Sequence, residues 1–354
     1  MQTWDVIVAG AGIIGASLAL ELRERGASVL LLDNGIPGRE ASFAAAGMLA
    51  PADPDTPSAL RDLAFASAQM YPEFVRKLES VSGISVDFRR QGTIKFFDTA
   101  SAPPLYRRLS DGELRALEPG ISRPTSHVPF FVAEDTVDPR LLMRATLAAA
   151  ERKGVVISGN TEVTGIKRHP DFVEVLGGEK HMARAAVNCR GAWAGAPVRP
   201  RKGQMLAFLS DKKELLRHVI VASDVYLVPR SSGKILAGAT VEDAGYDKTI
   251  EAHTMQKLHQ AAARLAPGLE NLPVVEQWAG LRPGTPDDLP LLGESPERGI
   301  FVAAGHFRNG ILLAPVTARI MANLIMGMPA GMNIEAFSPE RFCAAPVAAL
   351  PDKT

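Results

Sequence analysis

"WDVIVAGAGIIGASLALELRERGASVLLLD" (residues 4–33) decides the fold of this chain. Residues 4–10 are nearly all apolar, which is typical of a buried strand, and residues 13–25 have the apolar spacing of a helix that ends at Gly26. Residues 28–33 form a second short apolar run. This order predicts a strand–helix–strand unit with two parallel strands.

Three glycines, Gly10, Gly12 and Gly15, lie at the junction between the first strand and the helix. Glycines permit a tight turn there and let a pyrophosphate approach the helix N-terminus. Asp33 follows Gly15 by 18 residues (33 − 15), where an acidic side chain accepts the ribose hydroxyls of an adenosine. The alternative is a glycine-rich turn in an ordinary α/β fold, but the complete context favours a dinucleotide site. The pattern alone does not choose between NAD and FAD.

The charge balance and the cysteines restrict the classes of function. Lysine plus arginine number 39 and aspartate plus glutamate also number 39, so the formal net charge is zero. The chain has no excess of positive charge that would attract nucleic acid or an anionic membrane. Cys189 and Cys343 have neither a disulfide pattern nor metal-ligand spacing, which favours a reducing compartment. Arg319 interrupts the longest apolar stretch and the first strand begins at about Trp4, so neither a membrane span nor a signal peptide is expected. These features predict a cytoplasmic protein.

The rest of the chain alternates between helical and strand-like segments. The dinucleotide-type strand comes first, and another strand that leads into a glycine turn comes last, which indicates two domains with interleaved segments. Helices are expected between Ser58 and Gly83 with Ser58 as cap, within 109–120, over 138–154 with Asp138 as cap, over 251–265, and from about Gly310 to Met326. Strands are expected within 86–97, 184–193 and 299–305, a hairpin that turns at 231–233, and a loop-rich segment over 278–293.

Two arginines lie in stiff surroundings rich in proline and glycine. Arg282 precedes a proline, and Arg308 lies between an aromatic residue and an Asn-Gly turn. A planar guanidinium in such a loop suits bidentate capture of a carboxylate. The alternative for each is a structural ion pair, with Asp287 or Asp288 as the partner. Tyr226 is either a core residue or a donor to the same anion.

Small residues predominate in "ASFAAAGMLAP" (41–51). Such residues let the backbone lie against a flat or bulky group. They also occur at the start of a buried helix, which composition alone favours.

Together these motifs resemble the D-amino acid oxidase superfamily of flavoproteins and, within it, the bacterial glycine oxidases of thiazole (thiamine) synthesis. The resemblance extends from about residue 5 to 325, and the last four of its stretches are the more specific ones. The matching stretches are "VIVAGAGIIGASLALEL", "SFAAAGMLAP", "NCRGAWAG", "KGQML", "VYLVPR", "GATVEDAGYDKT", "WAGLRPGTPDDLPLLG" and "GHFRNGILLAP".

The resemblance implies an α/β fold in which a Rossmann-type FAD-binding domain is interleaved with a mixed-sheet α+β substrate domain. The expected FAD-binding domain comprises 1–82, 138–198 and 276–342, and the substrate domain comprises 83–137 and 199–275. Residues 343–354 are expected to form a frayed tail.

The resemblance also implies a binding site for FAD rather than NAD. Ile13, Ile14, Asp33 and Asn34 would line the adenosine end, Ser42 and 46–48 would pass beside the flavin ring, Val163 would contact the adenine by its backbone, and 306–312 would close over the pyrimidine edge. The complete expected set is Gly10, Gly12, Ile13, Ile14, Gly15, Asp33, Asn34, Ala41, Ser42, Ala46, Gly47, Met48, Val163, Gly191, His306, Phe307, Arg308, Asn309, Gly310, Ile311 and Leu312. The residues expected at the substrate are Tyr226, Arg282 and Arg308 on its carboxylate, with Met48 and Ala50 nearby.

This sequence departs from the family at Arg190, because the turn before "GAW" usually holds small residues and Arg190 is large. Either Arg190 points to solvent or the packing at this turn differs from that of the family.

The implied activity is oxidative deamination of glycine, and of small amines such as sarcosine or D-alanine, with oxygen as acceptor. The products would be glyoxylate or another 2-oxo acid, ammonia and hydrogen peroxide. Hydride transfer to flavin needs no protein acid or base and no metal. The positive end of the helix near Gly310 would face the flavin. The resemblance further implies a dimer or tetramer with no nucleic-acid partner.

Several alternatives share this fold. They are a D-amino acid or sarcosine oxidase, a dehydrogenase that passes electrons to a quinone, and the flavin domain of a tRNA-modifying enzyme, which the neutral charge disfavours. A flavin-binding protein without catalytic activity is disfavoured by the joint presence of Tyr226, Arg282 and Arg308.

Overall fold

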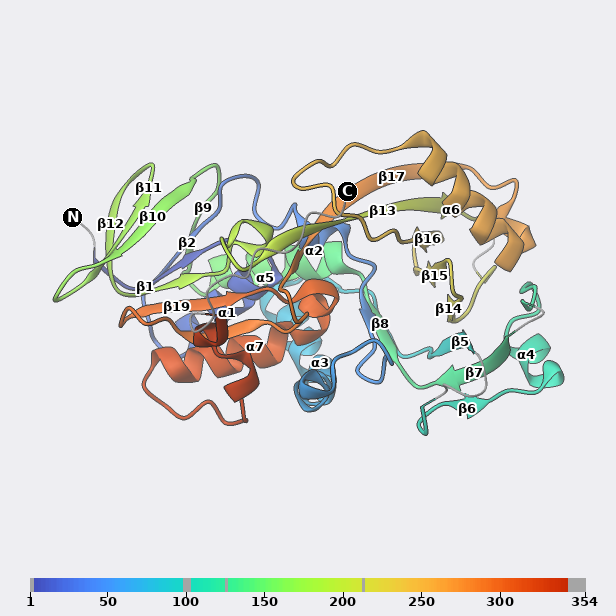
Figure 1. Cartoon of the computed structure of the whole chain (residues 1–354), viewed down its shortest axis with the longest axis horizontal. Coiled ribbons are helices and arrows are strands. Elements are labelled where there is room, and N and C mark those ends of the chain that lie inside the picture. Colours follow the sequence, from blue (N-terminus) through green and yellow to red (C-terminus); the bar gives the residue numbers. More distant parts are fainter. Residues whose placement is uncertain (1–2, 98–102, 125–126, 212–213, 343–354) are drawn as a thin grey trace.

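The computed structural model describes residues 3–97, 103–124, 127–211 and 214–342, which form two lobes, each built on one eight-stranded sheet (Figure 1). The expected frayed tail at 343–354 lies outside the described residues. No helix in the described ranges is long and apolar enough to cross a membrane.

The sheet of the first lobe is mostly parallel. β1 lies in its centre, parallel to β2 on one side and to β12 on the other, as the strand–helix–strand pattern predicts. Its strands are β1 (Thr3–Ala9), β2 (Val29–Leu32), β9 (Val156–Ser158), β10 (Val163–Arg168), β11 (Val173–Gly177), β12 (Glu179–Asn188), β18 (Leu291–Glu294) and β19 (Ile300–Ala304).

Four helices complete the core of the first lobe: α1 (Ile13–Glu24), α3 (Arg61–Ser82), α5 (Pro139–Arg152) and α7 (Gly310–Ile325). α5 begins as predicted, because the Asp138 carboxylate accepts hydrogen bonds from the amides of Arg140 and Leu141. The prediction that Ser58 caps α3 was wrong. Ser58 starts a single 3₁₀ turn, Ser58–Leu60, and α3 begins only at Arg61, with no side-chain cap.

The sheet of the second lobe is largely antiparallel. α6 (Ala252–Leu265) packs against β13 and β16. The helix expected within 109–120 is α4 (Asp111–Leu117), which begins with a capping box of Ser110 and Glu113. The predicted hairpin is formed by β15 and β16. The strands, in sheet order, are β17 (Val274–Gly284), β13 (Arg199–Leu209), β16 (Lys234–Gly238), β15 (Tyr226–Pro229), β14 (Val219–Val221), β5 (Thr93–Phe97), β7 (Val128–Val132) and β6 (Arg107–Arg108).

The segment 278–293 was expected to be rich in loops, but its first half is the end of a strand. β17 continues to Gly284 and pairs with β13 along its length, with Arg282 opposite Arg201. A proline is tolerated there because β17 is an edge strand of the sheet. The pairing also places 276–284 in the second sheet, although the expected domain boundary assigned these residues to the first domain.

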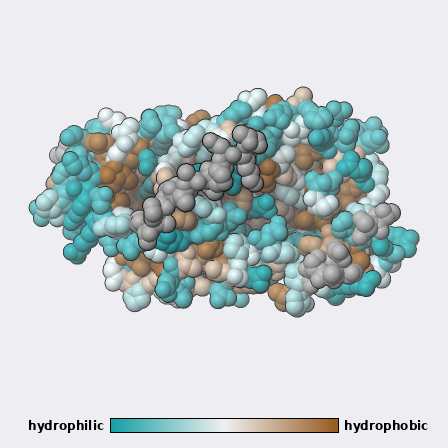
Figure 2. Space-filling view, viewed as in Figure 1, coloured by the Kyte–Doolittle hydropathy of each residue, from teal (hydrophilic) through white to brown (hydrophobic). Residues whose placement is uncertain are grey.

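The chain crosses between the lobes several times through short elements. A three-stranded sheet of β3 (Met48–Leu49), β8 (Asp135–Val137) and β4 (Phe88–Arg89) lies on these crossings, and α2 (Ala41–Ala44) precedes β3. On the face shown in Figure 2, hydrophilic side chains of the described residues surround small separate groups of apolar ones. These crossings bring residues from both lobes to one cavity.

Candidate active site

A cavity of about 1010 Å³ is lined by residues of both lobes. The first lobe contributes the turn before α1, the segment 38–57, the turn at 189–193 and the start of α7. The second lobe contributes Lys95, Met205, Tyr226 and Arg282. The volume exceeds what a small substrate alone requires, so the cavity has room for a large cofactor beside it.

The turn before α1 is shaped by two glycines. A Cβ atom on Gly10, whose φ is +104°, would lie 2.3 Å from the Cys189 carbonyl oxygen, and one on Gly15 would lie 1.9 Å from the Gly10 carbonyl oxygen. Both clashes involve backbone, so the turn requires glycine at both positions. The N-terminus of α1 faces the cavity; the Ser42 hydroxyl accepts a hydrogen bond from the Ile13 amide at 3.0 Å, and the N-cap residue Gly12 has no side chain to cap the other amides. Such a helix end suits a pyrophosphate.

The acidic residue at the end of β2 lies where the pattern predicts, on the cavity wall. The Asp33 carboxylate accepts hydrogen bonds from the amide of Ala11 at 2.7 Å and from that of Gly35 at 3.0 Å. It therefore links the end of β2 to the glycine turn. A carboxylate has about four acceptor positions, so capacity remains for the hydroxyls of a ribose.

Nearly all the residues predicted for the cofactor lie on the cavity wall, and two do not. Gly15 packs behind the wall against Gly10, and Leu312 is buried, with its carbonyl accepting a hydrogen bond from the Ser67 hydroxyl at 2.6 Å. The residues on the wall are Gly10, Gly12, Ile13, Ile14, Asp33, Asn34, Ala41, Ser42, Ala46, Gly47, Met48, Val163, Gly191, His306, Phe307, Arg308, Asn309, Gly310 and Ile311, and with them Ala50, Tyr226 and Arg282.

The run of small residues forms part of this wall and is not the start of a buried helix. α2 has only four residues and none of them is buried, so the interpretation favoured by composition was wrong. Three side chains fasten the backbone of this run: Arg140 donates to the Phe43 carbonyl at 3.3 Å, Trp278 to the Ala44 carbonyl at 3.0 Å, and Arg230 to the Ala46 carbonyl. A fixed backbone without bulky side chains can lie flat against a planar ring.

Arg190 packs against the wall instead of extending freely into solvent. Its guanidinium donates to the Val163 carbonyl at 2.9 Å and to the Asn188 side chain at 3.1 Å. Arg190 therefore does not simply point to solvent, because its hydrogen bonds tie the turn after β12 to β10. Val163, expected to contact adenine by its backbone, has its carbonyl engaged by this arginine.

The N-terminus of α7 also faces the cavity without a side-chain cap. Phe307 precedes it in a left-handed conformation, with a φ of +45° that few aromatic residues adopt. His306 is buried beside it, with Nε2 hydrogen-bonded to the Thr317 hydroxyl at 3.1 Å. Burial lowers the pKa of His306 to about 3, so the imidazole is neutral near pH 7.

Replacing His306 by glutamine should flatten the acid dependence of folding stability. The pKa of His306 is about 3 in the folded chain against an ordinary 6.5, so the unfolded chain binds the proton first as pH falls. The stability that the neutral imidazole contributes is complete above pH 6.5 and is lost between pH 6.5 and 3, at up to about 1.4 kcal/mol per pH unit. Urea unfolding between pH 4 and 7 should show a steeper loss for the wild type. Equal slopes would contradict the shifted pKa.

The second lobe supplies a cluster of polar groups at the cavity. Arg282 donates to the Thr240 carbonyl at 3.0 Å, and the Tyr226 hydroxyl lies beside its guanidinium. Burial raises the pKa of Tyr226, which keeps its hydroxyl protonated as a donor. Burial also lowers the pKa of Arg282, and the like charge of Arg308 adds to this effect. Two guanidinium groups and a phenol hydroxyl on the wall of one cavity form a site for an anion.

Arg308 has a different partner from the one expected. It lies 3.3 Å from the Asp55 carboxylate, with 48% of the arginine side chain and 78% of the aspartate side chain exposed. Such an exposed pair contributes little stability. Asp287, one of the two predicted partners, pairs with Arg341 at 2.8 Å. Arg282 has no carboxylate within ion-pair distance among the described residues.

Sequence reasoning missed a buried lysine on the cavity wall. Lys95 is 2% exposed, and its ammonium lies 3.1 Å from Glu134, 3.3 Å from Asp53 and 3.0 Å from the Tyr106 hydroxyl. Burial opposes its charge, but the carboxylates of Glu134 and Asp53 outweigh it and raise the pKa of Lys95. A lysine within the apolar run "TIKFF" is the signal that could have identified this group.

Comparison with known proteins agrees with this geometry. The family described as FAD dependent oxidoreductase matches residues 5–324. A glycine oxidase of Bacillus licheniformis is 34% identical over 96% of this chain and 98% of its own length. The crystal structure of glycine oxidase from Geobacillus kaustophilus has a TM-score of 0.91 and 31% identity, and the match covers 96% of this chain and 98% of that one.

The bifunctional protein ThiO/ThiG of Trichormus variabilis is 34% identical over 96% of this chain and 55% of that protein. The chain therefore spans about half the length of the bifunctional relatives that it matches.

Proposed function

The chain belongs to the family of FAD-dependent oxidoreductases, and from this we propose that it oxidises glycine, and small amines such as sarcosine or D-alanine, with oxygen as acceptor. Oxygen and water would be consumed, and the products would be glyoxylate or another 2-oxo acid, hydrogen peroxide and ammonia, or methylamine in place of ammonia from sarcosine. The observation that carries the proposal is the pair Arg282 and Arg308 with Tyr226, on the wall of the same cavity as the glycine turn and the small-residue run. The glycine oxidase relatives support the choice of glycine.

The residues of the cavity fit FAD. Gly10 and Gly15 leave no room for a Cβ atom. The N-termini of α1 and α7, which lie on the cavity wall, can face a pyrophosphate and an electron-rich ring. Residues 41–48 can lie against the flavin. When bound, FAD supplies the hydride acceptor for the α-carbon of the amine.

The side chains of this chain hold the substrate in place. Arg282 and Tyr226 donate to its carboxylate, and Arg308 leaves Asp55 to supply a second guanidinium. These bonds hold the α-carbon in one orientation. The substrate is then already positioned for the reaction, and the barrier no longer includes the entropy of bringing the reactants together. The buried Tyr226 keeps its proton because its pKa is raised.

Peroxide release tests the proposal directly. The purified holoprotein is assayed with glycine, sarcosine, D-alanine and D-proline, and peroxide is measured per bound FAD. The proposal expects peroxide with glycine as the best substrate of the four. Reduction of a quinone without peroxide would indicate the dehydrogenase alternative. No reaction with any of the four amines would contradict the proposal.

Replacing Asp33 by alanine should weaken FAD binding more than it changes turnover per bound FAD. The variant loses the hydrogen bonds to Ala11 and Gly35 together with those proposed to the ribose, at roughly 1.5–3 kcal/mol, or about 10- to 150-fold in Kd. Titration of apoprotein with FAD, followed by flavin fluorescence, measures the change. Asp33→Asn is the control, because it keeps one acceptor oxygen. Normal FAD affinity of the alanine variant would place the ribose elsewhere.

A further inference from the structure

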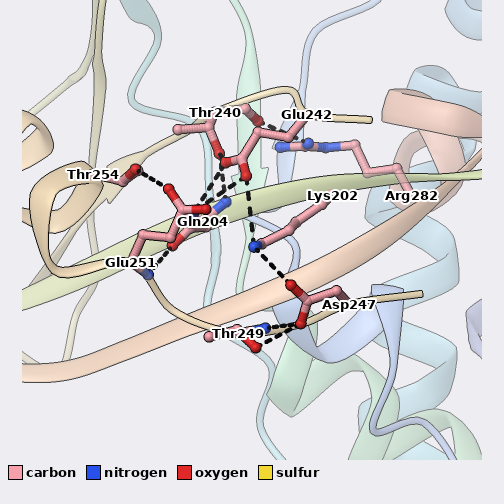
Figure 3. A network of polar contacts seen from close by, with 9 residues as sticks. All are labelled: Lys202, Gln204, Thr240, Glu242, Asp247, Thr249, Glu251, Thr254 and Arg282. Atoms are coloured by element: carbon pink, nitrogen blue, oxygen red, sulfur yellow. Dashed lines mark hydrogen bonds and ion pairs between the residues drawn. The ribbon is translucent and has the colours of Figure 1, made fainter. Parts of the chain in front are cut away.

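A buried lysine and a carboxylate lie behind Arg282, and the cavity wall does not include either of them. Lys202 is on β13 and is 1% exposed, although lysine is rarely buried without a partner. Its ammonium lies 3.6 Å from the Glu242 carboxylate and 4.0 Å from the Asp247 carboxylate. Figure 3 shows this lysine reaching from the strand toward both acids.

Glu242 links this pair to Arg282. It accepts hydrogen bonds from the Thr240 hydroxyl and from the Gln204 amide at 2.9 and 3.2 Å. The carbonyl of the same Thr240 accepts the Arg282 hydrogen bond (Figure 3). The backbones of Lys202 and Glu242 also hydrogen-bond to each other in both directions. The positions of Glu242 and Arg282 are therefore coupled through one residue.

The charge of Glu242 affects how strongly Arg282 can bind an anion. Its negative charge acts on Arg282 through space and favours the charged guanidinium. An unbalanced carboxylate behind Arg282 would also repel an incoming substrate carboxylate, since the two anions would be on either side of the same cation. The Lys202 side chain is buried, so water does not screen its charge. Its ion-pair partners among the described residues are Glu242 and Asp247. Its charge offsets that of Glu242.

We propose that Lys202 is a positioning residue that neutralises Glu242 and so leaves the charge of Arg282 available to the substrate carboxylate. The inference rests on the proposed function, in which Arg282 binds that carboxylate. Lys202 does not touch the substrate and acts only through Glu242 and Arg282. The same network fixes the Thr240 carbonyl, so geometry and charge can be separated by choosing variants that change one of them.

Acetate is the probe, because it carries the carboxylate but no amine to oxidise. Its Kd is measured on holoprotein variants by the change in flavin absorbance. Lys202→Met, which leaves Glu242 unbalanced, should weaken acetate binding roughly tenfold. Glu242→Gln keeps an acceptor for Thr240 and removes the negative charge, so it should tighten binding by roughly threefold or more. The double variant should return close to the wild-type Kd.

Opposite signs for the two single variants separate an electrostatic role from a merely structural one. If Lys202→Met and Glu242→Gln both weaken acetate binding, the network is only a scaffold and the proposal is overturned. An unchanged Kd in Lys202→Met would overturn it as well. Arg201→Gln is the matched control, because Arg201 precedes Lys202 on β13 and pairs with the exposed Asp243. The Kd of this variant for acetate should equal that of the wild type.

A third variant separates this inference from the proposed function. Arg282→Met should weaken acetate binding more than Lys202→Met does. If Arg282→Met binds acetate normally, the proposed function and the inference both fail. If Arg282→Met weakens binding while Lys202→Met and Glu242→Gln have no effect, only the inference fails. All Kd values are taken per bound FAD, with the melting temperature recorded beside them.

Discussion

Replacing Arg282 by methionine is expected to lower kcat/KM for glycine by roughly 30- to 1000-fold per bound FAD, or about 2–4 kcal/mol. The loss is large because the Arg282 guanidinium is buried and forms no ion pair with a carboxylate among the described residues. Its charge is therefore available to the substrate. Methionine has a similar length and leaves the fold and the flavin in place. Steady-state peroxide release, normalised to bound FAD, measures the change.

Two comparisons make the result interpretable. Arg282→Lys should recover only part of the activity, because an ammonium cannot offer two parallel donors in a plane. Arg308→Met should lose less, because Arg308 is half exposed and already pairs with Asp55. A low melting temperature with normal kcat/KM per FAD in Arg282→Met would show that Arg282 is structural.

Gly203→Ala should lower kcat/KM for glycine by about 100-fold without loss of FAD. A Cβ atom on Gly203 would lie 2.2 Å from Nη1 of Arg282, so the methyl group would displace the guanidinium from its place across β13. A shift of about 1 Å in a substrate-holding group can cost this much. The expected signature is a higher KM and a weaker Kd for acetate, with FAD content unchanged.

A glycine in open surroundings far from Arg282 is the control for adding a methyl group. A Cβ atom on Gly112, in α4, meets no atom within 4 Å, so Gly112→Ala should have wild-type kinetics. If Gly203→Ala also has wild-type kinetics and acetate affinity, the guanidinium does not bind the carboxylate from this position.

Strong periodicity and complete motifs made part of the fold predictable. β1, α1 and β2 follow from short apolar runs with glycines between them, and α5 follows from a cap, a proline and a regular apolar face. β17 was missed because its proline and two glycines are typical of a loop, and only the pairing with β13 makes it a strand. Ser58 was misplaced as a cap because local composition cannot tell a 3₁₀ turn from the first turn of a helix.

The site was predictable only in its parts that lie within motifs. Resemblance to a family indicated Arg282, Arg308 and Tyr226, and the structure brings all three to one cavity. The partner of Arg308 could not be predicted, because Asp55 is 253 residues away in sequence. The lysine behind Arg282 was equally hidden, since the sequence does not show that β13 turns Lys202 into the protein toward Glu242.

The most direct test of the account is reduction of the bound flavin by glycine without oxygen. Anaerobic holoprotein is mixed with increasing glycine in a stopped-flow instrument, and flavin absorbance is followed. We expect complete bleaching, with a rate that saturates as glycine increases, and a much weaker apparent affinity for glycine in Arg282→Met. Flavin that stays oxidised with glycine, sarcosine, D-alanine and D-proline would contradict it.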